Sequence, residues 1–437
     1  MSALREESAP LVKAPEVVEV PASRNARLVS GSVLIVVGLL CALGLGLGSH
    51  AGYDARFGLS PAGAAIKIPA LAVPARVAAI VLGALVIVFG VWRIARGFSR
   101  KAMRWVVAIS IVAVVFSFLC WSCTGSQGTT LDLLGLLRQT IFLAVPLILG
   151  ALAGVVCERS GVINVAIEGQ MLCGAFAGAL LGSITDSTAI GIVAALVAGG
   201  LIGLLLALFA IRYLVNQVVL GVVINLLALG ITGYVYDALM AKDQNTYNTP
   251  PGLHAINIPG LSDIPIIGPL LFEQNLIVYA MYVLIVVIDL ALFRSKWGLR
   301  TRAVGEHPRA ADTVGINVRR TRYVNVIVGG VIAGLGGASL TLGSALPFGK
   351  NMTNGKGFIA LAAVIFGRWS PRGAVGAALL FGFADALQNV LSFIGTPVAI
   401  PSNFLAMLPY LATILAVAGL VGRVRAPAAD GEPYVGR

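Results

Sequence analysis

Long apolar runs separated by short polar or charged segments follow one another along most of the chain. A helix needs about twenty apolar residues to cross a bilayer. The runs that meet this length lie at 28–48, 76–92, 105–123, 133–156, 162–183, 188–211, 217–240, 275–293, 323–345, 373–392 and 404–422. A shorter run, 357–367, would cross only if protein surrounded it or the bilayer thinned around it. The pattern predicts an all-α, polytopic membrane helix bundle of about 11–12 spans with broken or short helices.

The composition supports a membrane protein. Of the 437 residues, 58% are hydrophobic and only 11% are charged, and the mean hydropathy is +0.93. Soluble domains carry about 25% charged residues because their surface faces water. This excludes a soluble enzyme, a disordered chain and a small disulfide scaffold.

The basic residues predict the orientation of the chain. Twelve crossings place both termini on one side, and with that side inside, most of the 31 basic residues fall in cytoplasmic segments, as the positive-inside rule requires. We therefore expect cytoplasmic N- and C-termini. The exceptions lie outside or at outer ends of spans: Arg56, Lys67, Arg76, Arg138, Lys242, Lys350 and Lys356.

Glycines recur every four residues in two of the predicted spans. One set is Gly174, Gly178 and Gly182, and the other is Gly330 and Gly334. Residues four apart share a helix face, and glycine there lets two helices approach closely. The spacing predicts tight helix–helix contacts.

Polar residues inside spans are the candidates for a substrate pathway, and they are Asn164, Glu168, Asn225 and Asp385. A structural role for Glu168, in which its carboxylate binds backbone donors of a broken helix, is an open alternative. Interruptions at 157–161, 351–357 and 368–373 predict such breaks, and paired breaks in two halves of a transporter indicate its substrate site. We expect Asp289, near the inner end of its span, to pair with Arg294.

The basic loop 294–322 contains a short predicted helix. Pro308 suits the first helical position and Gly315 a helix end, and Ala310 and Ala311 lie side by side between them. Small residues would let another protein approach closely. A solvated connector held by phospholipid headgroups fits the pattern equally well.

Motifs for catalysis, metal binding or a cofactor are not recognisable in the sequence. His50, His254 and His307 are far apart, and the stretch 343–350 lacks the spacing of a phosphate-binding loop and a Ser or Thr after Lys350. We expect neither a metal nor a cofactor, and any ATP hydrolysis would need another chain.

Four segments resemble ABC-transporter permeases of the simple-sugar and branched-chain amino-acid type, in the nucleoside-uptake branch. They are ERSGVINVAIEGQMLCGAF (158–176), GEHPRAADTVGINV (305–318), GGVIAGLGGASL (329–340) and GKGFIALAAVIFGRWSPRGAVGAALLFGFADALQ (355–388). The resemblance covers 131–423 and marks this region as a permease core. It leaves a cytoplasmic tail at 1–27, an additional three-span module at 28–130 and a cytoplasmic tail at 424–437.

The resemblance implies a permease subunit in a bacterial plasma membrane, not an enzyme. It implies uptake of nucleosides, purine nucleosides especially. The implied partners are a cytoplasmic ABC ATPase, a second homologous permease and an extracytoplasmic substrate-binding lipoprotein, with membrane lipid around them and no nucleic acid. The family's coupling helix maps onto Pro308, Arg309, Ala310, Ala311, Asp312 and Gly315.

Two other functions stay open at this point. A simple sugar is the alternative substrate within the same family. An ion-coupled secondary transporter is the alternative of another class, and it would need essential carboxylates within the membrane.

Overall fold

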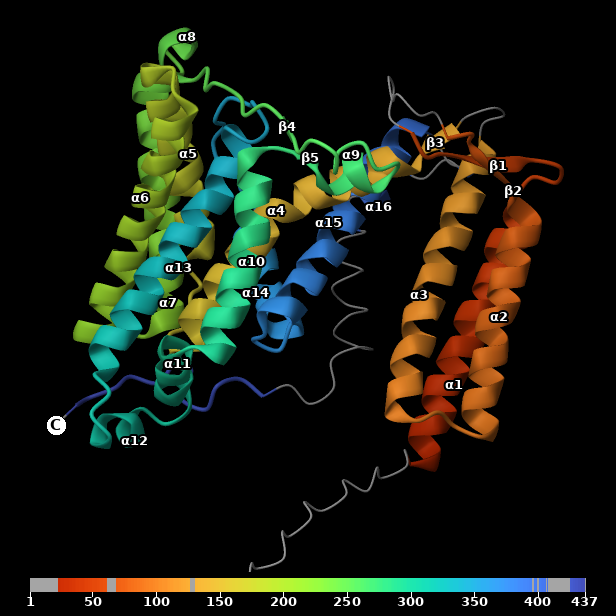
Figure 1. Ribbon diagram of the computed structural model, residues 1–437, viewed down its shortest axis with the longest axis horizontal. Helices are drawn as coiled ribbons and strands as arrows, with labels where there is room; N and C mark the ends of the chain where they lie inside the picture. Colours follow the sequence, from red (N-terminus) through yellow and green to blue (C-terminus); the bar gives the residue numbers. More distant parts are fainter. Residues whose placement is uncertain are drawn as a thin grey trace, which may run out of the picture. The chain divides into compact units, whose positions relative to one another are not determined.

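The computed structural model describes residues 23–60, 68–125, 130–394, 397–398, 401–405, 407 and 425–436 (Figure 1). Within these residues, 10 helices are long and apolar enough to cross a membrane, and Lys356–Phe366 is a shorter apolar helix. The prediction of a multi-pass helical bundle is therefore confirmed. Of the predicted span 404–422, only residues 404, 405 and 407 are described, so that span lies outside the described part of the chain.

The chain forms two compact units, and the first contains three membrane helices. Its helices are α1 (Arg24–Leu39), extended by the π-helical turn η1 (Leu40–Gly46), then α2 (Ala75–Ala95) and α3 (Arg100–Ser122), which the 3₁₀ turn η2 (Cys123–Gly125) follows. Strands β1 (Asp54–Gly58) and β2 (Leu71–Pro74) are neighbours between α1 and α2. The α1–α2 contact is close, because a Cβ at Gly38 would lie 2.7 Å from the Gly83 carbonyl oxygen.

The second unit carries the remaining helices. After β3 (Thr130–Asp132) come α4 (Leu133–Glu158), α5 (Ile167–Thr185), α6 (Thr188–Ala207), η3 (Leu208–Arg212), α7 (Gln217–Val235), η4 (Tyr236–Met240) and α8 (Gln244–Tyr247). Strand β4 (Ile256–Asn257) pairs antiparallel with β5 (Glu273–Gln274), and α9 (Ile267–Leu271) lies between them in sequence. Then follow α10 (Leu276–Arg294), α11 (Lys296–Glu306), α12 (Pro308–Thr313), α13 (Val318–Thr341), α14 (Lys356–Phe366), α15 (Pro371–Ile394) and α16 (Ser402–Leu405).

Short polar side chains begin many of these helices. A side-chain oxygen of the residue before the helix accepts a hydrogen bond from a backbone N–H of the first turn, which otherwise has no partner. The residues that do so are Ser23, Ser99, Asp132, Ser187, Asn216, Asp243, Asn275, Ser295 and Asn317. The polar interruptions between apolar runs therefore define where the helices start.

The predicted glycine contacts join α5, α6 and α13, which lie side by side in Figure 1. Gly174 of α5 faces the backbone of Gly334 of α13, and Gly330 faces Gly199 of α6. Gly178 and Gly182 both approach Gly191 of α6. The close contacts expected from the spacing are confirmed.

Two local predictions are wrong. Asp289 does not pair with Arg294, since its carboxylate binds Arg372 at the start of α15 at 2.7 Å. A residue five positions along a helix lies on a different face, whereas partners are three or four apart. The predicted span 162–183 becomes helical only at Ile167, so Asn164 lies in non-helical backbone and not in a helix.

Enlarging Gly334 will destabilise the protein more than enlarging Gly230. A Cβ at Gly334 meets the Ala195 carbonyl, whereas nothing lies within 4 Å of a Cβ at Gly230. We expect Gly334→Val to cost at least about 1–3 kcal/mol through overpacking and Gly230→Val to be near neutral. Thermal unfolding of the purified variants in detergent measures the difference, and equal melting temperatures would contradict the packing described.

Candidate functional site

The first helix break lies between the end of α4 at Glu158 and the start of α5 at Ile167. Side chains of α7 form hydrogen bonds with backbone groups of this break. Gln217 Oε1 accepts the Ile163 N–H at 2.7 Å, and Asn225 Nδ2 donates to the Val165 carbonyl at 2.9 Å. Asn225 Oδ1 also accepts the Gly169 N–H at 2.8 Å. The Asn225 amide therefore binds the backbone at two points, within the break and in the first turn of α5.

Asn164 is fully buried within this break. Its Nδ2 donates to Gln170 Oε1 at 3.0 Å and contacts Cys157 Sγ at 3.4 Å. The side chain therefore joins the end of α4 to the first turn of α5.

Glu168, in the first turn of α5, binds the start of α14. It is 7% exposed, and its Oε1 and Oε2 accept the N–H groups of Gly355 and Gly357 at 2.8 and 2.6 Å. A carboxylate at a helix N-terminus satisfies unpaired donors and complements the helix dipole. Gly355 has φ +83°, in the left-handed region that favours glycine. The geometry is that of the structural alternative, a carboxylate binding backbone donors of a broken helix.

The residues that follow the C-terminal end of α14 bind residues at the start of the same break. Arg368 and Trp369 follow α14 in left-handed conformations, with φ 56° and 52°. Trp369 Nε1 donates to the buried carboxylate of Glu158, and Arg159 Nε donates to the Trp369 carbonyl at 2.7 Å. The interruptions that the sequence placed far apart therefore contact each other at both ends of α14.

Asp385, on α15, is half-buried and lies near enough to Lys356 for their charges to interact. Lys356 is the first residue of α14, directly after Gly355. The structure thus places Asp385 near the end of α14 that Glu168 binds. Asn164 and Asn225 instead brace the break that precedes α5.

The loop 294–322 folds as α11, α12 and a tight turn. Pro308 is the first residue of α12, and Gly315 has φ +82°, which suits the predicted helix end. Ala310 is exposed, whereas Ala311 is 3% exposed and packs inside the chain. The outer face of α12 therefore carries Arg309 and Ala310 but not Ala311.

Sequence reasoning missed the role of the C-terminal segment, residues 425–436. Arg322, 2% exposed, donates from Nη1 to the Glu432 carbonyl at 2.8 Å and from Nε to the Ser160 carbonyl at 3.2 Å. Burial raises the pKa of Asp430 to about 7, against the opposing effect of the Arg322 guanidinium. The polar and aromatic residues of this tail, Asp430, Glu432 and Tyr434, are the sequence feature that could have indicated contacts with the rest of the chain.

Comparison with known proteins identifies the family. Residues 136–421 match the family described as "Branched-chain amino acid transport system / permease component". The guanosine ABC transporter permease protein NupQ of Bacillus subtilis is 44% identical over 68% of this chain and 95% of its own length. The nucleoside ABC transporter permease protein NupC of Lactococcus lactis is 36% identical over 69% and 96%. No solved structure matches the chain.

These relatives are permeases, and the matched region contains both the paired breaks and the loop with α12. The resemblance inferred from the four sequence segments is confirmed. The chain belongs to the branched-chain amino acid transport system / permease component family.

Proposed function

We propose that this protein is the membrane-spanning permease subunit of an ATP-driven, binding-protein-dependent nucleoside importer in a bacterial plasma membrane, with purine nucleosides as preferred substrates. The observation that carries the proposal is the 44% identity to a guanosine permease along 95% of that relative. The nucleoside permease at 36% supports the same substrate class.

ATP hydrolysis belongs to a separate cytoplasmic subunit, and an extracytoplasmic lipoprotein delivers the nucleoside. A second, different permease completes the membrane part. The chain is 44% identical to NupQ but 26% identical to NupP, a second guanosine permease protein of the same organism. This difference supports a complex in which the present chain takes the NupQ-like position beside a NupP-like partner.

The contacts support different roles for the proposed pathway residues. Asn225 and Glu168 bind backbone groups around the breaks with their side chains, whereas the Asn164 side chain binds the Gln170 side chain. Unpaired backbone groups in an apolar medium cost several kcal/mol each, so these side chains stabilise the non-helical segments that border the passage. Asp385, half-buried near the start of α14, is the residue of the four best suited to contact a nucleoside hydroxyl.

A simple sugar is the second candidate substrate. A putative glucose ABC transporter permease protein of Haloferax volcanii, TsgC13, is 35% identical over 58% of this chain and 77% of its own length. An ion-coupled secondary transporter has less support, because the Glu168 carboxylate that could carry a coupling proton is engaged by two backbone N–H groups.

Uptake by the reconstituted complex tests the function. Proteoliposomes that contain both permeases, the ATPase and the binding protein should accumulate labelled guanosine only with internal ATP. Unlabelled adenosine should compete, whereas glucose and ribose should not. Competition by glucose alone would select the sugar alternative, and uptake abolished by an uncoupler with ATP present would select ion coupling.

The orientation can be tested by thiol labelling. With the five native cysteines replaced, a membrane-impermeant reagent should label Asn245→Cys in intact cells and should label Arg300→Cys only after permeabilisation. Both positions are exposed, so access depends on the side of the membrane and not on burial. The reverse pattern would exclude a cytoplasmic position for α12.

Two carboxylate-to-amide substitutions distinguish a residue that stabilises a helix break from a residue that contacts the substrate. Glu168→Gln should lower the stability of the complex by about 1.5–3 kcal/mol, the value of a hydrogen bond to a charged group. Asp385→Asn should leave the melting temperature unchanged and slow uptake about tenfold, the equivalent of one lost hydrogen bond. Uptake per assembled complex and thermal unfolding measure the two effects. Wild-type uptake in Asp385→Asn would remove that residue from the pathway.

A further inference from the structure

The C-terminal segment is bound to α11 and reaches α12. The Ala429 N–H donates to the Gly305 carbonyl at 2.9 Å, and the Ala428 N–H donates to Glu306 Oε2 at 3.2 Å. In Figure 1 the segment, dark blue, passes α11 and α12 before the chain ends, and α12 lies at the opposite end of the second unit from α8. The end of the chain is therefore part of the same surface as α12.

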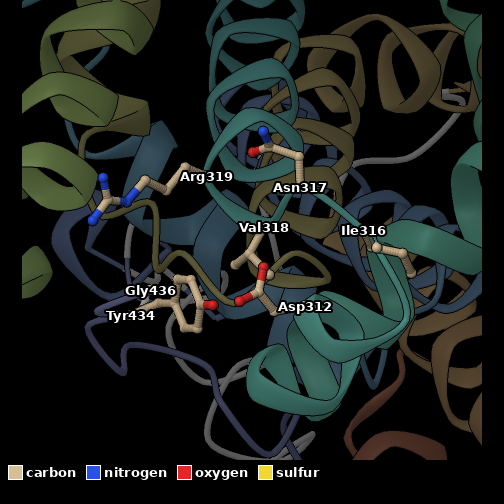
Figure 2. A pocket seen from close by; sticks show the side chains of 8 residues that line it. Asp312, Ile316, Asn317, Val318, Arg319, Tyr434 and Gly436 are labelled. Carbon is tan, nitrogen blue, oxygen red and sulfur yellow. The ribbon is translucent and has the colours of Figure 1, made fainter.

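Tyr434 fixes this segment to α12. Only 8% of Tyr434 is exposed, and it packs with Val304, Ala311 and Val318. Its hydroxyl donates a hydrogen bond to the Asp312 carboxylate, which raises the pKa of Tyr434. Figure 2 shows the two oxygens directed at each other. A residue near the chain end thus supports α12 from the inside.

A cavity of about 370 Å³ lies between the chain end and the turn after α12. Asp312, Asn317, Arg319, Tyr434 and Gly436 are among the residues that line it (Figure 2). Its volume falls within the range of small binding pockets, so it is large enough to receive a side chain of a partner.

Exposed apolar and basic side chains lie close in sequence to the residues that line this cavity. Val314, just after α12, is 74% exposed, and Val435, next to Tyr434, is 69% exposed. Arg309, Arg319 and Arg320 are exposed as well. The loop 294–322 holds eight basic residues against two acidic ones. A complementary surface would present carboxylates around an apolar contact.

We propose that the ATPase subunit binds a composite surface made of α12 and residues 434–436 through an acidic surface that places one side chain in the cavity. The inference rests on the proposed function, since it extends the docking site of the same ATPase. A protein partner fits better than lipid headgroups, because the exposed valines adjoin in sequence the lining residues of a cavity in which Asp312 and Tyr434 are already held by each other.

Affinity measurements on the full permease pair in nanodiscs test this. Val435→Glu adds a negative charge where the partner is expected to be acidic, and it should weaken ATPase binding at least about tenfold. Ala426→Glu adds the same charge to an exposed position earlier in the segment and should change the dissociation constant less than about twofold. Both variants should keep the wild-type melting temperature, since both side chains are exposed. Equal affinity of the two variants would overturn the inference.

Two further experiments identify the partner and separate the role of the chain end from that of α12. Ala310→Trp, on the outer face of α12, should also weaken binding. If Ala310→Trp weakens ATPase binding and Val435→Glu does not, α12 docks the ATPase and the proposed role of the chain end is wrong. If the wild-type chain binds no ATPase, the proposed function fails too. A photoreactive probe at Val435→Cys, in a chain without native cysteines, should cross-link to the ATPase. Cross-linking to anionic lipid instead would overturn the inference in favour of membrane contact.

Discussion

The structure of the second unit depends on the need to satisfy backbone groups that a broken helix leaves without partners inside a membrane. Lipid offers no hydrogen bonds there, so non-helical backbone persists only where it is buried in protein or lines a water-filled cavity. Glu168 and Asn225 supply those groups with their side chains. Removing one such partner leaves a buried donor or acceptor unpaired, which costs about 1–3 kcal/mol and more for a charge. The breaks are therefore specified by a few polar atoms and not by the apolar pattern.

Helix α14 shows what this arrangement makes possible. Its 11 residues extend only about 16 Å at ~1.5 Å per residue, well short of the ~30 Å hydrocarbon core. Protein therefore has to cover it. Glycines of α4 allow the close approach, because Cβ atoms at Gly150 and Gly154 would lie 2.8 and 2.7 Å from side-chain atoms of Ala360 and Val364. With Glu168 at one end and Glu158 and Arg159 at the other, the short helix is anchored at both ends to residues that flank the first break.

Sequence periodicity predicted most of the fold because each span must satisfy the same length and hydropathy requirement. The glycine faces of α5 and α13 were predictable for a similar reason, since spacing along a helix is local. Contacts between residues distant in sequence could not be predicted. The partner of Asp289 is Arg372, 83 residues later, and nothing in either segment indicates the pairing. For the candidate site, the residue types were found, but the sequence could not decide whether Glu168 binds backbone or substrate, because both roles require a buried carboxylate. The contacts of the C-terminal segment were missed because it is short, polar and without periodicity.

The position of Arg322 also has a consequence for biogenesis. Its guanidinium joins Ser160, which precedes it by 162 residues, to Glu432, which follows it by 110 residues. At a synthesis rate of ~5–20 residues per second, Arg322 is made about 10–30 s after Ser160, and Glu432 follows about 5–20 s later. The long helices of the second unit can thus insert during translation, whereas the bonds that join Ser160, Arg322 and Glu432 form only after residue 432 has been made. The surface around α12 is therefore completed only after the helices that precede the C-terminal segment have been made.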